Sequence, residues 1–333
     1  MNRPRPFTNV LVTGSAGFIG SHFVDHLLKT DAAVTVVSLD ALTYAGRREH
    51  LPPEGTPRHS FIHGDIRDQE LVTRTIAENA IDLVVNFAAE THVDRSILGP
   101  AAFVETNVRG TFALLEAVRE ASKTGPIRFH QVSTDEVYGS LGAADAPWDE
   151  DAPFRPRSPY SASKAAGDLL VHAYVNTFGV FATRSHSSNN FGSRQHEEKF
   201  IPTMFRAFLG GNRAPLYGDG SNIRDWIHVE DHCEAIDRIV RGAPAGSVYN
   251  VGGSCEITNL DLAKRIARVV DRVNPANAPH ERLIEFVADR PGHDFRYALD
   301  CRRIAHDLAF VPKRSIEQGL EELQAVALDR VAR

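Results

Sequence analysis

The chain has 333 residues, of which 42% are hydrophobic and 24% charged, a composition typical of a folded globular protein. Lysine and arginine number 37 against 43 aspartates and glutamates, and this formal net charge of −6 argues against a general nucleic-acid binder. The three cysteines, Cys233, Cys255 and Cys301, are too sparse for a disulfide scaffold or a CxxC-type zinc site. At this length we expect two domains, or one large α/β domain with an added lobe.

The N-terminal segment MNRPRPFTN has no apolar stretch of the kind that secretory signals carry. No apolar run anywhere in the chain approaches the length of about 18 residues that predicts a membrane-spanning helix. We therefore expect a cytoplasmic protein with neither a membrane nor a nucleic acid as partner.

Through the first half of the chain, short apolar runs alternate with helical patterns. Continuous apolar strands separated by amphipathic helices predict a parallel sheet that is covered on both faces. The expected fold is therefore α/β, a Rossmann-like doubly wound parallel sheet with a smaller C-terminal α/β substrate lobe. The apolar runs lie at 10–12, 34–39, 61–63, 83–87 and 129–133, and helices are expected at 19–28 and 101–121.

The pattern changes near residue 185. Residues 187–225 are rich in Asn, Gly, Arg and Pro and carry one helical pattern, at 200–209, and residues 226–250 look helical and then strand-like. Two further helical patterns follow, at 260–273 and 316–331. We predict a cofactor-binding domain made of 1–185 plus 226–250, and a substrate-binding lobe made of 186–225 plus 251–333.

A glycine-rich turn joins the first predicted strand to the first predicted helix. Gly14, Gly17 and Gly20 follow a GxxGxxG spacing, with Phe18 and Ile19 between the last two. Such glycines let the backbone approach a pyrophosphate, which the N-terminus of the helix then stabilises. A strand–helix turn without any ligand is the competing interpretation of the glycines alone.

Acidic residues at the ends of the next two strands favour a dinucleotide. Asp40 ends the second strand, where a carboxylate accepts hydrogen bonds from the adenosine ribose hydroxyls. No arginine directly follows it, so we expect NAD rather than NADP as cofactor. Asp65, followed by Ile66, ends the third strand close to where the adenine edge would lie, although a turn carboxylate explains this spacing equally well.

Tyr160 and Lys164 lie four residues apart, on one face of a predicted helix. A lysine ammonium one turn away favours the phenolate, which can then take a proton from a substrate hydroxyl. The pair occurs often by chance, but together with the glycine turn it resembles the extended short-chain dehydrogenase/reductases. In that superfamily, the positions of Ala88 and Asn107 contact the cofactor.

Thr134, Asp135 and Glu136 follow the fifth strand, at the sheet edge that faces the ligand crevice in open α/β folds. Two neighbouring carboxyl groups can differ in pKa, so that one is protonated and the other ionised. Elimination of water needs this division, with a base for a carbon-bound proton and an acid for the leaving hydroxyl. A solvated loop with two acids is the alternative.

Longer motifs make the resemblance more specific. The chain is similar to the nucleoside-diphosphate-hexose 4,6-dehydratases, and within them to the dTDP-glucose 4,6-dehydratases, over about residues 9–325. The epimerases and decarboxylases of the same superfamily usually lack the Asp-Glu pair. The similarity lies in segments 40–46, 87–97, 133–139, 158–164, 188–190, 216–220, 223–226 and 288–293.

The resemblance implies a lyase that uses NAD on a sugar nucleotide. Tyr160, supported by Lys164, would take the C4-hydroxyl proton, and Thr134 would hydrogen-bond the 4-keto oxygen. Glu136 would remove the C5 proton while Asp135 protonates the departing C6 hydroxyl. A homodimer through the helices beginning near Ala101 and Tyr160 is also implied. The implied substrate contacts are Thr91, Asn189, Lys199, Tyr217, Arg224, Asn259, Arg290 and His293.

Two segments depart from the resemblance, 183–199 and 326–333, and leave the nucleobase and the sugar open. An NAD-dependent epimerase or decarboxylase of a related sugar nucleotide, such as a UDP-sugar, is the alternative activity. A non-catalytic nucleotide sensor is a third hypothesis, but it would be expected to lack Tyr160 or Lys164. His228 and His232 lie four residues apart without a further ligand, so no metal is expected.

Overall fold

The structure is a computed structural model that describes residues 7–332, with side chains described up to residue 325. Residues 1–6, part of the segment in which no secretory signal is expected, lie outside the described residues, as do the side chains of the divergent segment 326–333. The strands are β1 (Asn9–Thr13), β2 (Thr35–Asp40), β3 (His59–His63), β4 (Leu83–Asn86), β5 (Arg128–Thr134), β6 (Ala182–Ser187), β7 (Asn189–Phe191), β8 (Ala214–Tyr217), β9 (Ile223–His228), β10 (Val248–Val251), β11 (Glu256–Thr258) and β12 (Ile284–Val287). The helices are α1 (Phe18–Thr30), α2 (Gln69–Glu78), α3 (Val93–Leu98), α4 (Ala101–Phe103), α5 (Thr111–Ala121), α6 (Pro159–Phe178), α7 (Phe200–Leu209), α8 (Val229–Gly242), α9 (Asn259–Val273), α10 (Arg302–Leu308) and α11 (Ile316–Ala332), joined by short turns that include η2 (Val104–Gly110) and η3 (Asp135–Tyr138).

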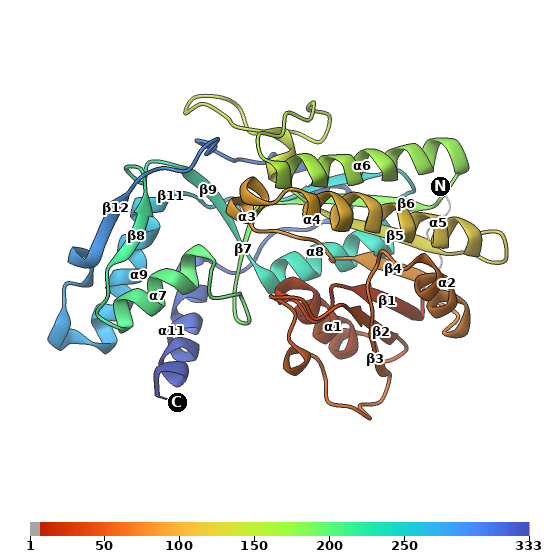
Figure 1. Cartoon of the computed structure of the whole chain (residues 1–333), viewed down its shortest axis with the longest axis horizontal. Coiled ribbons are helices and arrows are strands. Elements are labelled where there is room, and N and C mark those ends of the chain that lie inside the picture. The colour runs from red at the N-terminus through yellow and green to blue at the C-terminus, as the bar shows by residue number, and fades with distance from the viewer. Residues whose placement is uncertain (1–6, 333) are drawn as a thin grey trace.

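The larger part of the described chain is a seven-stranded parallel sheet in the order β10-β6-β5-β4-β1-β2-β3. Successive residues of β1 show why both faces are covered. Leu11 packs with the α2, α5 and α6 side, whereas Val10 and Val12 pack with the α1 and α8 side. Because side chains alternate along a strand, a strand that is apolar at every position requires a helix layer on each face. Figure 1 shows the sheet with α5 and α6 on one side and α1 on the other. The predicted Rossmann-like fold is confirmed.

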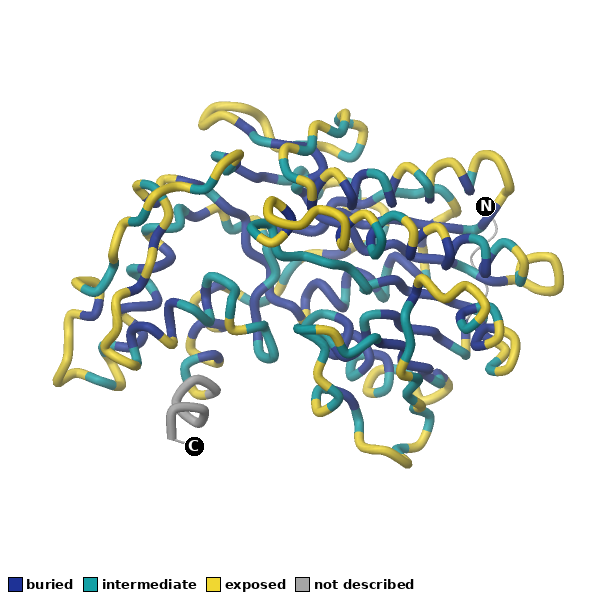
Figure 2. Tube along the Cα trace, in the orientation of Figure 1, coloured by how far each residue is buried: buried dark blue, intermediate teal, exposed yellow. Residues whose placement is uncertain are grey.

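A smaller lobe lies beside the carboxyl ends of the central strands (Figure 1). It contains the three-stranded sheet β11-β9-β7 and the pair β12-β8. Its apolar core is formed by α7, α9 and α11, and includes Phe208, Trp226, Leu262 and Leu320. Figure 2 shows both cores as buried segments with the exposed loops around them. The domain boundaries that we expect from the sequence stay a prediction.

The expected single helix at 101–121 is interrupted. The chain forms α4, then the π-helical segment η2, and only then α5. The side chain of Thr111 donates to the main-chain carbonyl of Asn107 at 2.8 Å. The side-chain amide of Asn107 is hydrogen-bonded to Glu90, which lies outside this helix. Inserted π-turns of this kind commonly occur at functional sites. Within the described residues, no helix is long and apolar enough to cross a membrane.

Candidate active site

In the glycine turn, backbone segments pack too closely to leave room for side chains. Gly14 has a φ of +64°, and a Cβ there would lie 2.5 Å from the amide nitrogen of Ala88. A Cβ on Gly20 would lie 2.3 Å from the carbonyl oxygen of Gly14, so the turn and α1 fit together only without side chains. Helix α1 begins after Gly17, with no side chain capping its first amides. These free N–H groups and the adjacent space fit a phosphate group.

Asp40 links this turn to the loop after β2. Its two carboxylate oxygens accept from the amides of Ala16 and Leu42, each at 2.8 Å. Burial raises the pKa of Asp40, and these two hydrogen bonds oppose the rise. A carboxylate has about four acceptor positions, so ribose hydroxyls can still be bound. Asp65 is held by the Arg67 guanidinium at 2.6 Å.

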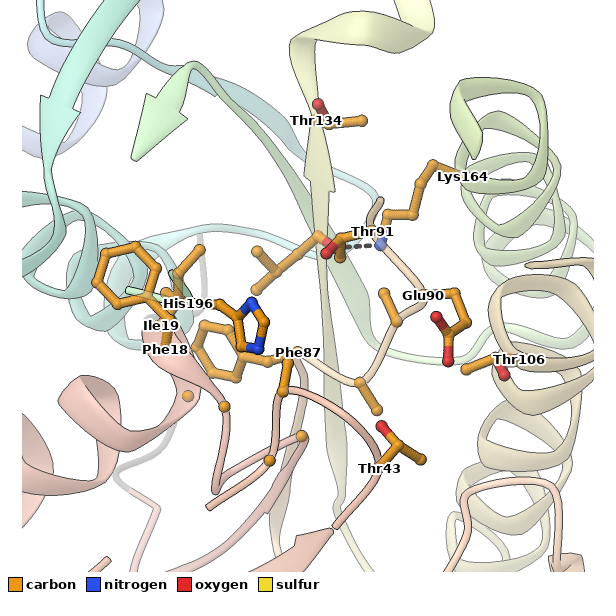
Figure 3. A pocket seen from close by; sticks show the side chains of 18 of the residues that line it. Phe18, Ile19, Thr43, Phe87, Glu90, Thr91, Thr106, Thr134, Lys164 and His196 are labelled. Atoms are coloured by element: carbon orange, nitrogen blue, oxygen red, sulfur yellow. Dashed lines mark hydrogen bonds between the residues drawn. The ribbon is translucent and has the colours of Figure 1, made fainter. Parts of the chain in front are cut away.

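A cavity of about 440 Å³ runs from the glycine turn to the ends of β5 and α6. Figure 3 shows it from close by, with Phe18 and Ile19 on one side and Lys164 and Glu90 on the other. It brings together most of the residues predicted from the sequence. The predicted residues that line it are Gly14, Gly17, Phe18, Ile19, Gly20, Asp40, Asp65, Ile66, Ala88, Thr91, Thr134, Asp135, Glu136, Tyr160, Lys164, Asn189 and Lys199.

Asn107, which the resemblance places among the cofactor contacts, is not part of the cavity lining. Its side chain is 2% exposed, and it is bonded to both the amide and the carbonyl of Glu90, at 2.9 and 3.0 Å. It also donates to the hydroxyl of Ser163 at 2.8 Å. Asn107 therefore holds the loop after β4 against α6, and it acts on the cavity through Glu90.

The two acids after β5 lie in different environments. Asp135 is 3% exposed, and burial together with the charge of Glu136 raises its pKa well above the usual value. Burial also raises the pKa of Glu136, but the guanidinium groups of Arg290 and Arg224 work against this rise. The arrangement favours a protonated Asp135 beside an ionised Glu136, which is the division that an elimination needs.

Tyr160 and Lys164 both lie in the cavity wall on α6. Ser158 starts this helix through a reciprocal capping box with Ser161. The pKa of Tyr160 is raised well above its usual value by burial and by the charge of Glu136, while Thr134 lowers it. Burial lowers the pKa of Lys164, whose ammonium donates to the carbonyl of Val132 at 2.8 Å (Figure 3). The expected lowering of the tyrosine pKa by lysine is therefore outweighed here by burial.

The other predicted substrate residues lie beyond the cavity lining, on the smaller lobe. Arg224 is 5% exposed and donates to the main-chain carbonyls of Ile223, Asp294 and Phe295, at 2.7 to 3.2 Å. Arg290 is less engaged, because it lies 3.5 Å from Asp94 and its buried Nε has no partner among the described residues. Tyr217, His293 and Asn259 are also on this lobe: Tyr217 donates to Asp94 at 3.4 Å, His293 contacts Asp289 at 2.7 Å, and Asn259 begins α9.

Sequence reasoning missed a cluster of charged side chains that includes Glu198 and His196 of the cavity lining. The carboxylate of Glu198 lies 3.3 to 3.7 Å from Arg95, His92 and His196. The Arg95 guanidinium also lies 4.1 Å from the centre of the Tyr44 ring. These side chains come from three distant segments, so no local spacing could have revealed them.

The two histidines near the start of α8 have separate partners. His228 accepts from the amide of Glu230 at 3.3 Å, and His232 contacts the side-chain oxygen of Asn190 at 2.7 Å. Burial lowers the pKa of His232 to about 3. The residues that the structure describes contain no cluster of three or more potential metal ligands.

Comparison with known proteins agrees with this geometry. The family model described as GDP-mannose 4,6 dehydratase matches residues 11–323. The chain belongs to this family. Its members are extended short-chain dehydrogenase/reductases, so the resemblance predicted from the motifs is confirmed.

Individual members of the family are similar over almost their whole length. A dTDP-glucose 4,6-dehydratase of Xanthomonas campestris pv. campestris (strain B100) is 48% identical, over 93% of this chain and 90% of the relative. The protein Agl12 of Haloferax volcanii, a low-salt glycan biosynthesis protein, is also 48% identical, over 94% and 96%. The crystal structure of DesIV, a dTDP-glucose 4,6-dehydratase of Streptomyces venezuelae with NAD and TYD bound, has a TM-score of 0.89 at 42% identity and covers 98% of each chain.

Proposed function

We propose that this protein is a hydro-lyase that dehydrates dTDP-glucose to its 4-keto-6-deoxy sugar nucleotide with NAD as a bound cofactor. The observation that carries the proposal is the buried Asp135–Glu136 pair, which faces the same cavity as Tyr160 and the glycine turn. The dTDP-glucose dehydratases among the relatives, at 43–48% identity, support the reaction, and DesIV supports the cofactor.

The glycine turn, Asp40 and Asp65 would hold the cofactor, with Phe18, Ile19, Ile66 and Ala88 as apolar contacts. The chemistry that bound NAD supplies is a hydride acceptor for sugar C4 and, afterwards, a hydride donor for C6. Because it ends as it began, no external reductant is needed.

Tyr160 begins the reaction by accepting the proton of the C4 hydroxyl. Burial raises the tyrosine pKa, so the charged form of Lys164 is needed to stabilise the phenolate. Thr134, at the end of β5, donates its hydroxyl hydrogen to the developing C4 carbonyl oxygen. That hydrogen bond makes the neighbouring C5–H bond more acidic.

The elimination is then divided between two carboxyl groups. Glu136, ionised beside Arg290 and Arg224, takes the proton from C5. Asp135, protonated because it is buried next to Glu136, gives its proton to the C6 hydroxyl, which leaves as water. After hydride transfer to C6, Glu136 would return its proton to C5. Tyr160 would release the proton taken from the C4 hydroxyl, and the Asp135 carboxylate would take up a proton, so that both groups return to their starting states. The atoms then balance as glucose minus one water.

For the substrate we propose a division between the lobes. The predicted domain of 1–185 plus 226–250 would bind NAD, and 186–225 plus 251–333 would bind the nucleotide of the substrate. Arg290 is the better candidate for the pyrophosphate because its Nε has no partner within the described part of the chain, whereas Arg224 is held by carbonyls. Thr91, Asn189, Lys199, Tyr217, Asn259 and His293 are the remaining proposed contacts.

We also propose a cytoplasmic homodimer. Large apolar side chains are exposed on neighbouring helices of one face: Val104 at 53%, Phe112 at 42%, Leu169 at 57% and Phe178 at 52%. They lie on η2, α5 and α6, which pack against one another. Exposed apolar side chains gathered on adjacent helices are typical of a subunit interface.

The test is product analysis by NMR after incubation with dTDP-glucose and, separately, with UDP-glucose, without added reductant. A 4-keto-6-deoxy product from dTDP-glucose is expected. If only UDP-glucose gave this product, the substrate would carry uracil in place of the proposed thymine. A C4 epimer of either substrate would overturn the dehydratase assignment.

A further inference from the structure

A third polar residue continues the face of α6 that carries Tyr160 and Lys164. Asp168 lies one turn beyond Lys164, at the spacing that places side chains in a row along a helix. It is completely buried, with an exposed fraction of 0%. It is absent from the cavity lining, so it does not touch what the cavity binds. A buried carboxylate needs compensating partners, and these show what it does.

The first partner ties α6 to the strand that carries the acids. Ser133, the residue before Thr134, donates its hydroxyl hydrogen to Oδ2 of Asp168 at 2.5 Å. Lys164 reaches the same strand one residue earlier, through the carbonyl of Val132. Asp168 and Lys164 therefore hydrogen-bond to consecutive residues of β5, the two that precede the catalytic Thr134.

The second partner approaches from β6. Nε2 of His186 lies 3.3 Å from Oδ2 of Asp168, and both side chains are buried. The amide nitrogen of Asn250 donates to two carbonyls, so its oxygen must accept from Tyr138, at 3.0 Å. Since Tyr138 has one hydrogen, its oxygen must in turn accept from Nδ1 of His186, at 2.5 Å. Nδ1 therefore carries a hydrogen, and Nε2, which has no hydrogen-bond partner among the described residues, is the nitrogen that faces Asp168. Ser133 is thus the hydrogen-bond donor to the Asp168 carboxylate within the described part of the chain.

We propose that Asp168 is a positioning residue of this active site: through Ser133 its buried carboxylate fixes α6 on β5 beside the Lys164 anchor and puts a negative charge one helical turn from Lys164, and so decides how readily Tyr160 gives up its proton. The inference rests on the proposed function, whose first step needs an ionised Tyr160. It adds a residue outside the cavity to the machinery that the cavity shows.

The charges around Asp168 and Lys164 agree with this role. Burial lowers the pKa of Lys164, and Asp168 is the charged neighbour among the described residues that raises it. Without Asp168 the lysine would lose its proton at a lower pH, and a neutral lysine does not stabilise a phenolate. The other titratable groups that feel the charge of Asp168 are Arg184, His130 and Tyr138, and His186 faces it directly.

The experiment uses the holoenzyme as purified, labelled with ¹³C at the ζ carbon of tyrosine. The chain has seven tyrosines, so the spectrum is small enough to assign Tyr160 by comparison with Tyr160→Phe. In Asp168→Asn we expect the ionisation midpoint of Tyr160 to rise by about one pH unit, and kcat at neutral pH to fall about tenfold. The oxygen of the new amide can still accept from Ser133, and the side chain keeps its size, so this variant should fold.

A matched control separates this effect from general damage to the fold. Asp231 is equally buried, and it pairs with Arg314 at 2.7 Å, away from the cavity. Asp231→Asn should reduce stability without moving the Tyr160 midpoint. Asp168→Ser, which also removes the charge, is measured in the same way if Asp168→Asn does not fold.

An unchanged Tyr160 midpoint in the folded Asp168 variant, or an equal change in Asp231→Asn, overturns the inference. The titration needs no turnover, so it is independent of the substrate. A wild-type protein that leaves dTDP-glucose unchanged would contradict the proposed function. An ionisation midpoint of Tyr160 that is the same in the Asp168 variant as in the wild type would contradict only the role of Asp168.

Discussion

The two sides of the cavity are built differently. On the main-sheet side, Thr134, Tyr160 and Lys164 project from β5 and α6, whose apolar residues are locked into a core covered on both faces. On the smaller lobe, Arg224 and Arg290 come from a short strand and from a loop, and polar contacts place them. In the proposed mechanism, the rigid side would carry out the chemistry and the polar side would select and hold the substrate.

The largest expected effect is at the rigid side. Tyr160→Phe removes the hydroxyl that exchanges the C4 proton, so kcat should fall at the upper end of roughly 10²–10⁴-fold. The rate is measured by NMR as appearance of the 4-keto product. NAD content and melting temperature should stay close to wild type, because the ring remains packed beside Phe103. A variant with at least a tenth of the wild-type rate would contradict Tyr160 as the base.

The acidic pair should give the next largest effect and two different outcomes. Asp135→Asn and Glu136→Gln should each lower kcat by roughly 10²–10³-fold. In D₂O, however, Asp135→Asn should still exchange the C5 hydrogen, since Glu136 is intact, and Glu136→Gln should not. Mass spectrometry of recovered substrate and product measures this exchange. Exchange retained in Glu136→Gln and lost in Asp135→Asn would reverse the two roles.

The two arginines of the smaller lobe sharpen the comparison further. Arg290→Ala should raise KM for the sugar nucleotide about tenfold with little change in melting temperature, because its guanidinium is only loosely held. Arg224→Ala removes three hydrogen bonds of a side chain that is 5% exposed, although each of the three carbonyls keeps another donor, and should cost about 1–3 kcal/mol of stability. Steady-state kinetics and thermal melts together separate these effects, and a stability loss in Arg290→Ala larger than in Arg224→Ala would contradict this distinction.

The charge of Arg290 also predicts how activity depends on pH. Burial raises the pKa of Glu136 and Arg290 opposes this rise. Glu136 must be ionised to act as a base, so activity is lost as pH falls through its pKa. Removing Arg290 raises that pKa further, and the acidic limb of the kcat profile of Arg290→Ala should therefore move to higher pH. An acidic limb that stays in place would mean that another group controls it.

The sequence was most informative where apolar periodicity and chemistry coincide. β1 is apolar at three successive positions, Val10 to Val12, and leads into the glycine turn. β2 and β5 are buried up to their last residues and end in Asp40 and Thr134. The strands of the smaller lobe gave no such signal, because β7 and β11 have three residues each and β9 buries Arg224 and Asp225 among its apolar residues. Burial of polar groups that find partners far away in the sequence cannot be read from local patterns.

Asn107 and Asp168 illustrate the same limit inside the main domain. Asn107 lies in a π-helical segment that helical periodicity cannot distinguish from a continuous α-helix. Asp168 has ordinary spacing on an ordinary helix, and the contact on which its proposed role rests is with Ser133, 35 residues away. In both cases the residue acts on the cavity through a neighbour, and sequence motifs reveal direct contacts more readily than indirect ones.

The smallest expected effect concerns the segment 183–199, where the chain departs from the dehydratase motif. Arg194 of this segment pairs with Asp25 of α1 at 2.7 Å, and His22 of α1 donates to the carbonyl of Ser193 at 3.0 Å. The segment is thus fastened across the start of α1, beside the cavity that would hold the cofactor, and Gln195 and His196 line that cavity.

If this fastening retains NAD, Arg194→Ala should release it about threefold faster, as expected for a pair that is partly exposed to solvent and therefore weak. The measurement is NAD content during dilution and gel filtration. Arg206→Ala is the matched control, because Arg206 pairs with Glu197 of the same segment at 3.2 Å without reaching α1. Equal loss of NAD from both variants would assign the effect to the segment as a whole, and no loss from either would show that the pair contributes only to the link between the lobes.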